Sequence, residues 1–219
     1  MIQKKTGSIG LSFFMRTGTP ACVAPISFLF FPIRRAIIFP TEVISVEEML
    51  DLFDAQGNPA GITIRRGEDA PAGLYWPVVD VWIINSRGEI LIQKRDESKP
   101  NWPGYWCESA GGAVVSGEAP DTAALRETQE EIGFTVDFTR GSKVFEYLGE
   151  KSLKHVYLFC QDAELSALTC QKGEVSDVRY ATPDEIRALV RNGEMVPLGY
   201  ISQLLTMLPI LTSMYRKAD

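Results

Sequence analysis

Three glutamates near the middle of the chain have the residue type and spacing needed to bind a metal ion. Glu127, Glu130 and Glu131 stand at positions i, i+3 and i+4, and on a helix these positions share one face. Like charges at this spacing repel each other by roughly 0.2–0.5 kcal/mol per pair, so they do not stabilise a free helix. A hard divalent cation reverses that balance, because Mg²⁺ and Mn²⁺ take oxygen ligands. The spacing therefore indicates a metal site, with a solvated acidic face as the alternative.

The residues around these glutamates favour the metal site. Glu118 comes shortly before the expected helix and can fold back towards the same face. Arg126 adjoins Glu127 and can hold a carboxylate by a bidentate contact. Gly111 and Gly112 have no side chain to obstruct the backbone, so a main-chain carbonyl there can reach a metal.

Turn and cap signals predict the elements that must position these residues. A helix is expected over 120–132, because Pro120 and Asp121 suit its first turn and Gly133 suits its C-terminal cap. Further helices are expected at 182–191, after a capping box, and at 199–216, where apolar residues recur at helical spacing. Strands are expected on both sides of the turn at 57–59 and at 78–84, 89–94, 143–148, 155–160 and 178–181. This order predicts an α+β or mixed α/β fold with a mixed sheet covered on both faces.

The full spacing of the acidic segment resembles the Nudix box. The pattern is Gly112, five residues, Glu118, seven residues, Arg126-Glu127, two residues, Glu130-Glu131, one residue, Gly133 and the apolar Phe134. Thr128 departs from the family pattern, which prefers a larger aliphatic residue, but its side chain is expected on the inner side of the helix. The resemblance implies a Nudix-type α/β/α sandwich with a mixed sheet and a loop–helix–loop motif, covering about residues 48–205.

This resemblance implies that water attacks a phosphorus atom of a diphosphate with the help of a metal. The three glutamates of the expected helix would hold one or more Mg²⁺ ions, with Mn²⁺ as a substitute and the Gly111 carbonyl as a further ligand. Such a metal neutralises phosphate charge and lowers the pKa of a bound water. Glu118 and Arg126 would orient the ligands.

Residues outside the box are candidates for the general base and for substrate contacts. Glu174, in the expected loop before Val178, is a candidate base, and one of the box glutamates is the alternative. The candidate phosphate contacts are three basic residues, for which simple solvation is the alternative: Lys94, Arg95 and Lys99. The substrate itself is expected to be a small-molecule diphosphate.

Shorter stretches, at 50–65, 79–85, 93–95 and 102–106, resemble the isopentenyl-diphosphate-isomerase-like branch of the family. Trp106 is a candidate to stack on the organic part of a substrate, or else an anchor for its loop. An isomerase would use a cysteine, for which Cys107 is suitably placed, but those enzymes resemble one another in a histidine-rich metal site and this chain has only His155. A non-catalytic nucleotide-binding module is a further alternative, although such modules usually lack some of the box residues.

Composition and charge restrict the partners and the compartment. A net charge of −6 gives no general reason to bind nucleic acid or a membrane surface, and no apolar run reaches ~18 residues. Four cysteines without metal-ligand spacing favour reduced thiols in the cytoplasm. Residues 42–219 form the expected hydrolase domain, for which the family resemblance suggests a homodimer. Residues 1–41 are basic and free of acidic residues, which suits an organelle-targeting segment, a packed extension or translation from upstream of the natural start.

Overall fold

The computed structural model describes residues 47–215, so the interpretations of residues 1–41 lie outside the described part of the chain. The strands are β1 (Met49–Phe53), β2 (Pro59–Arg65), β3 (Trp76–Ile84), β4 (Ile90–Arg95), β5 (Trp106–Cys107), β6 (Ala110–Ala113), β7 (Gly141–Leu148), β8 (Ser152–Cys160) and β9 (Val175–Ala181). The helices are α1 (Pro120–Ile132), α2 (Pro183–Asn192) and α3 (Ile201–Tyr215), with a 3-10 turn at Leu165–Ala167. No helix within residues 47–215 is both long and apolar enough to cross a membrane.

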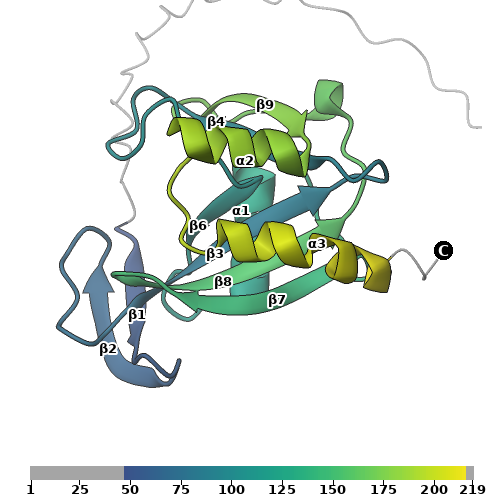
Figure 1. Ribbon diagram of the computed structural model, residues 1–219. Coiled ribbons are helices and arrows are strands. Elements are labelled where there is room, and N and C mark those ends of the chain that lie inside the picture. Colours follow the sequence, from purple (N-terminus) through teal and green to yellow (C-terminus); the bar gives the residue numbers. More distant parts are fainter. Residues whose placement is uncertain (1–46, 216–219) are drawn as a thin grey trace, which may run out of the picture. The chain divides into compact units, whose positions relative to one another are not determined.

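A mixed sheet built around β3 organises the described residues (Figure 1). Strand β3 pairs in parallel with β8 along its whole length, whereas its pairs with β4 and β6 are antiparallel. Strands β3 and β4 pair only at one end, where Ile83 and Ile84 lie opposite Leu91 and Ile90. Beyond that point β6 pairs with β3 and β5 pairs with β4, while β9 pairs with β4 along its whole length. The predicted mixed sheet is confirmed.

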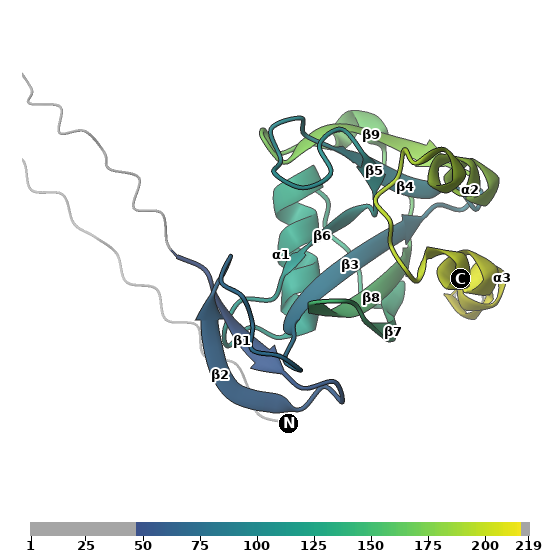
Figure 2. The same ribbon diagram turned by 60° about the vertical axis from the view of Figure 1, so that its left-hand side comes forward.

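Helices cover the two faces of this sheet, as predicted. Figure 2 shows α1 on one side and α2 with α3 on the other. Alternation along β3 sends Val79, Val81 and Ile83 to a core that includes residues of α1, and sends Trp82 and Ile84 to the core beneath α2 and α3. The acidic residues of α1 therefore lie on one defined side of the sheet.

Helix α1 has the bounds that its sequence signals predict. Pro120 occupies the first turn, and the helix ends at Gly133, whose φ of 68° is the left-handed conformation that glycine adopts without strain. Thr128 is fully buried, and its hydroxyl donates to the Ala124 carbonyl 2.6 Å away. Its predicted position on the inner side of the helix is confirmed, and the hydrogen bond explains how a polar residue is accommodated there.

Strands β1 and β2 form a separate antiparallel hairpin. Leu50, Leu52 and Ile64 from one face of this hairpin are buried together with Ala113, at the end of β6. The hairpin is therefore packed against the loop that leads from β6 into α1.

Candidate active site

A cavity of about 190 Å³ is lined in part by residues of α1. Its acidic lining comes from Glu48, Glu127, Glu130, Glu131 and Glu174. Its basic lining comes from Arg66, Arg95, Lys99 and Arg126, and the remaining lining residues are Gly111, Gly112 and Gln171. Most of the residues predicted from the Nudix pattern are thus brought together around one space.

Glu131 is the most deeply placed carboxylate that lines this cavity. Its Oε2 atom accepts hydrogen bonds from the Gln93 side-chain amide at 2.8 Å and from the Gly111 N–H at 2.9 Å. Burial nevertheless raises the pKa of Glu131 from 4.5 to about 8, because the two hydrogen bonds compensate only part of the lost hydration. Within residues 47–215, no ion pair involves this buried carboxyl group.

Glu127 occupies space that only a glycine leaves open. A Cβ atom on Gly112 would overlap its carboxylate, so the absence of a side chain on β6 lets Glu127 approach the strand. Burial raises the pKa of Glu127, and the nearby guanidinium of Arg126 offsets this only in part.

Arg126 forms hydrogen bonds with three glutamates of the box. Its Nε and one terminal nitrogen each lie 2.9 Å from an oxygen of Glu118, so the carboxylate held by a bidentate contact is that of Glu118, a partner that the sequence did not specify. The other terminal nitrogen reaches Glu127 at 2.7 Å and Glu130 at 3.2 Å. Burial raises the pKa of Glu118, but its hydrogen bonds, above all those from Arg126, outweigh this and lower the pKa overall.

Residues far away in sequence complete the lining of the cavity. Glu174, which precedes β9, forms an ion pair with Lys99 from the loop after β4. Arg95 lines the same cavity, and its Nε donates to the Asn101 carbonyl at 3.0 Å. The structure therefore places Glu174, Arg95 and Lys99 beside the box glutamates.

Two predicted substrate contacts do not line this cavity. Lys94 shares the face of β4 that carries Ile90 and Ile92, which belong to the core beneath α2 and α3. Trp106 packs against the same core, and the Arg179 guanidinium lies 4.8 Å from the centre of its ring. Alternation along β4 separates Lys94 from its neighbours Gln93 and Arg95, which face the site.

Sequence reasoning missed three residues that line the cavity, Glu48, Arg66 and Gln171, and also Gln93, which hydrogen-bonds to Glu131. Gln93 positions Glu131, and its place two residues before Arg95 on a strand was an available signal. Glu48 and Arg66 flank the hairpin of β1 and β2. No local pattern connects them with the box, since their position depends on how the hairpin packs.

The donor set suits a hard divalent cation. The cavity offers carboxylate oxygens from one helix face and the main chain of Gly111, with no sulfur or imidazole ligand among its lining residues. The raised pKa values of Glu127 and Glu131 show that added positive charge would stabilise their ionised forms. As placed, the side chains are held by Arg126, Gln93 and Gly111, and no three metal-ligating side chains within residues 47–215 converge on one point. The chemistry of Glu127, Glu130 and Glu131 nevertheless fits a metal, because three carboxylates of one helix line the same cavity.

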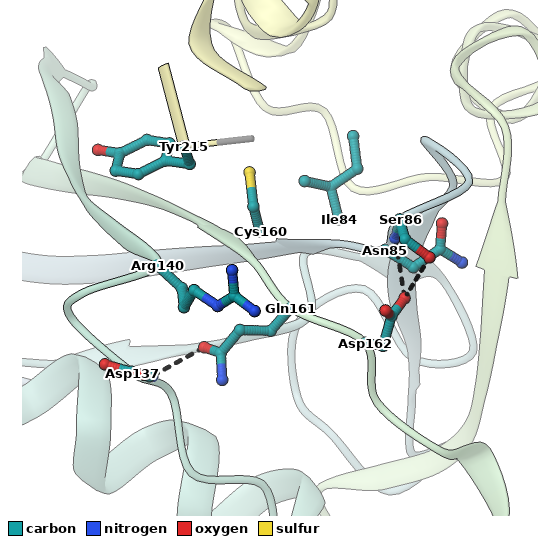
Figure 3. A pocket seen from close by; sticks show the side chains of 9 residues that line it. All are labelled: Ile84, Asn85, Ser86, Asp137, Arg140, Cys160, Gln161, Asp162 and Tyr215. Carbon is teal, nitrogen blue, oxygen red and sulfur yellow. Dashed lines mark hydrogen bonds between the residues drawn. The ribbon is translucent and has the colours of Figure 1, made fainter. Parts of the chain in front are cut away.

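A larger hollow, of about 530 Å³, lies elsewhere on the fold and has a different character (Figure 3). Asp162 in its wall accepts hydrogen bonds from the Ser86 N–H at 2.8 Å and the Ser86 hydroxyl at 3.0 Å. Gln161 accepts one from the Asp137 N–H at 2.7 Å. These polar groups hold turns together, and no box residue lines this space. Volume alone therefore does not identify the site, and the smaller cavity is the candidate because the box residues gather around it.

Comparisons with known proteins agree with the Nudix box pattern in this sequence. The sequence model of the NUDIX domain matches residues 74–199. A Nudix hydrolase of Listeria monocytogenes is 39% identical over 72% of this chain and 93% of its own length. An isopentenyl-diphosphate Delta-isomerase of Streptomyces coelicolor is 28% identical over 71% of this chain and 82% of its own.

The fold is also similar to that of solved structures. The crystal structure of a Deinococcus radiodurans protein matches with a TM-score of 0.61 and 28% identity, covering 74% of this chain and 99% of that one. The predicted Nudix-type fold is thereby confirmed. With its box residues gathered around one cavity and the matched region spanning most of the fold that carries them, the chain belongs to the Nudix hydrolases, which act on diphosphate linkages.

Proposed function

We propose that this chain is a Mg²⁺-dependent pyrophosphohydrolase that cleaves the diphosphate linkage of a nucleoside diphosphate joined to another group, or of a related organic pyrophosphate. The observation that supports the proposal most directly is that acidic and basic side chains line the same cavity. Carboxylates Glu127, Glu130 and Glu131 lie on one side, and the cations Arg95 and Lys99 contribute to the same lining. Carboxylates suit a metal, and the cations suit phosphate oxygens.

Each residue has a role that follows from its contacts. Glu127, Glu130 and Glu131 would hold the metal, with the Gly111 carbonyl as a further ligand. When bound, Mg²⁺ or Mn²⁺ neutralises phosphate charge and lowers the pKa of a bound water. Arg126 and Glu118 keep the helix face in position through their paired hydrogen bonds.

Glu174 is the proposed general base. Its carboxylate would take a proton from the attacking water as the new oxygen–phosphorus bond forms and the bridging phosphorus–oxygen bond breaks. The ion pair with Lys99 fixes the position of this carboxylate beside the box glutamates. Lys99 and Arg95 would then contact the substrate phosphates, whereas Lys94 and Trp106 are proposed to support the fold.

The structure gives less support to an isomerase, despite the relatives that carry that name. Burial, together with the nearby carboxylates of Glu108 and Glu131, raises the pKa of Cys107 well above its ordinary value. This opposes formation of the thiolate that a reactive cysteine needs. His155 lies in β8 and contacts Glu146 at 3.1 Å between Nδ1 and Oε1, away from the residues that line the cavity.

The compartment and the assembly state are part of the same proposal. Within the described residues, Cys107 and Cys170 are free thiols, which supports a reducing environment such as the cytoplasm. A homodimer is expected from the family resemblance, and sedimentation velocity would test it.

The decisive experiment measures hydrolysis with Mg²⁺ and with EDTA. The panel contains nucleoside di- and triphosphates, ADP-ribose, dinucleoside polyphosphates, a nucleotide-linked coenzyme and isopentenyl diphosphate, with the last also checked for its dimethylallyl isomer. Metal-dependent cleavage that falls by orders of magnitude in Glu130→Gln, but not in the exposed control Glu150→Gln, supports the proposal. Isomer formation without cleavage, or equal rates in wild type and Glu130→Gln, would contradict it.

A further inference from the structure

Arg66 and Glu48 stand at corresponding positions on the two arms of the hairpin formed by β1 and β2. The Arg66 N–H donates to the Glu48 carbonyl at 2.8 Å, and their side chains form an ion pair. Alternation places both side chains on the hairpin face that carries Leu50 and Ile64, which is the face packed against the rest of the fold. Both side chains line the cavity of the box glutamates.

The hairpin is docked directly on the loop that leads into α1. The Met49 carbonyl accepts a hydrogen bond from the Ser116 N–H at 2.7 Å. The Asp51 carboxylate accepts two more, from the Ser116 hydroxyl at 2.8 Å and the Gly117 N–H at 3.0 Å. Arg66 is therefore held relative to the box by defined contacts, even though it lies outside the matched NUDIX region 74–199.

The cations around the cavity differ in how strongly they are already engaged. Arg126 uses its guanidinium on Glu118, Glu127 and Glu130, so it serves the motif itself. Arg66 has only the Glu48 carboxylate as an ion-pair partner among the described residues, and the two side chains are 53% and 41% exposed. Exposed pairs of this kind contribute little stability, so a phosphate can displace Glu48 at low cost.

A guanidinium also has the right geometry for this role. Its planar donors match two non-bridging oxygens of one phosphate, which a lysine ammonium cannot do. Arg66 lines the same cavity as Glu127, Glu130 and Glu131, which places its guanidinium near the carboxylates proposed to bind the metal.

We propose that Arg66 is a substrate-binding residue. Its guanidinium binds a phosphate group of the diphosphate, which replaces the Glu48 carboxylate as its ionic partner. This inference rests on the proposed function and adds the hairpin of β1 and β2 to the active site. Glu48 acts as the occupant that phosphate replaces.

A neighbouring ion pair offers a matched control. Arg65 pairs with Glu47 at 3.0 Å, and both side chains are about as exposed as those of Arg66 and Glu48. They occupy the opposite face of the same hairpin, and neither lines the cavity. Arg65→Gln therefore removes an equivalent surface charge without touching the site.

The experiment measures methylenediphosphonate binding by calorimetry with Mg²⁺ present, and kcat/KM for any substrate that the hydrolysis panel identifies. Arg66→Gln should weaken binding and lower kcat/KM by about 10- to 100-fold, as expected for loss of a charge-assisted bidentate contact. Arg65→Gln should stay within about twofold of wild type. Glu48→Gln should bind the diphosphonate as well as wild type or up to about threefold more tightly, because a competitor for Arg66 has been removed.

The opposite directions expected for Glu48→Gln and Arg66→Gln separate phosphate binding from a structural ion pair. If the pair only stabilised the hairpin, both variants would weaken binding together and lower the Tm together, and the proposal would be wrong. Wild-type affinity in Arg66→Gln, or no diphosphonate binding by the wild type, would also overturn it. Because binding needs no turnover, failure of the hydrolysis panel leaves this result independently interpretable.

Discussion

Replacing Glu131 by glutamine should stabilise the metal-free protein while abolishing its activity. Glutamine has nearly the same shape, and its carbonyl oxygen can still accept from the Gly111 N–H. It carries no charge, however, and so avoids the cost of burying an ionised carboxylate. The same substitution removes a proposed metal ligand.

The size of the effect follows from the pKa of Glu131. Burial raises this pKa from 4.5 to about 8, so between these values the folded protein keeps a proton that the unfolded chain has released. Stability contributed by this group is therefore complete below about pH 4.5 and is lost as pH rises towards 8. The full shift corresponds to about 5 kcal/mol as an upper limit, at roughly 1.4 kcal/mol per pH unit.

Structural relaxation and water entry should reduce the stability difference between Glu131→Gln and wild type to about 3 kcal/mol. A gain of this size raises the Tm of the variant by roughly 6–12 °C for a chain of this length. Thermal unfolding of wild type and Glu131→Gln in EDTA, at pH 5.5 and pH 8.5, measures it. The variant should gain most at pH 8.5, and Mg²⁺ should then stabilise the wild type more than the variant. A wild type that is at least as stable as the variant at pH 8.5 in EDTA would refute the reasoning.

Two further substitutions test other contacts. Gly112→Ala should lower kcat/KM by about 100-fold, because the added methyl group displaces the Glu127 carboxylate from its place against β6. A misplaced catalytic group costs about this much in rate. A wild-type rate would contradict this prediction. Tyr200→Phe should lower Tm by roughly 3–10 °C with unchanged turnover, since it removes a buried hydroxyl that donates to Asp80 at 2.6 Å and accepts from Trp82 at 3.1 Å. Calorimetric unfolding and steady-state kinetics measure both properties, and an unchanged Tm would show that these hydrogen bonds contribute little.

The parts of the fold that sequence analysis predicted correctly are those specified by local signals. Helix α1 begins and ends as its proline and glycine indicate. Helix α2 begins with the predicted capping box, in which Thr182 and Glu185 exchange hydrogen bonds between side chain and backbone. Such signals depend on residues that are close in sequence, so they can be recognised without knowledge of the tertiary structure.

The parts that were missed depend on partners far away in sequence. Strand β6 has the sequence Ala-Gly-Gly-Ala, which has no strand propensity, and it is extended because Val78 to Val81 of β3 lie opposite it. Lys94 was grouped with Arg95 and Lys99 as a basic candidate for a phosphate contact, but Lys94 and Arg95 are adjacent, and adjacent residues on a strand face opposite sides. Only the packing of α1 on one face decides which of the two belongs to the site.

The two glycines of β6 show why the spacing of the box cannot be understood from α1 alone. A Cβ atom on Gly111 would lie 2.9 Å from Oε1 of Glu108, whereas one on Gly112 would overlap Glu127 on the opposite face of the sheet. Burial, with the Asp80 carboxylate nearby, raises the pKa of Glu108 to about 7. The strand thus runs between buried carboxylates on both faces, which only residues without side chains allow. On one face Lys154 compensates Asp80, at 2.8 Å between Nζ and Oδ2. On the other face Arg126 pairs with Glu127 and Glu130, whereas no ion pair within residues 47–215 involves Glu131, whose charge we propose that a metal compensates.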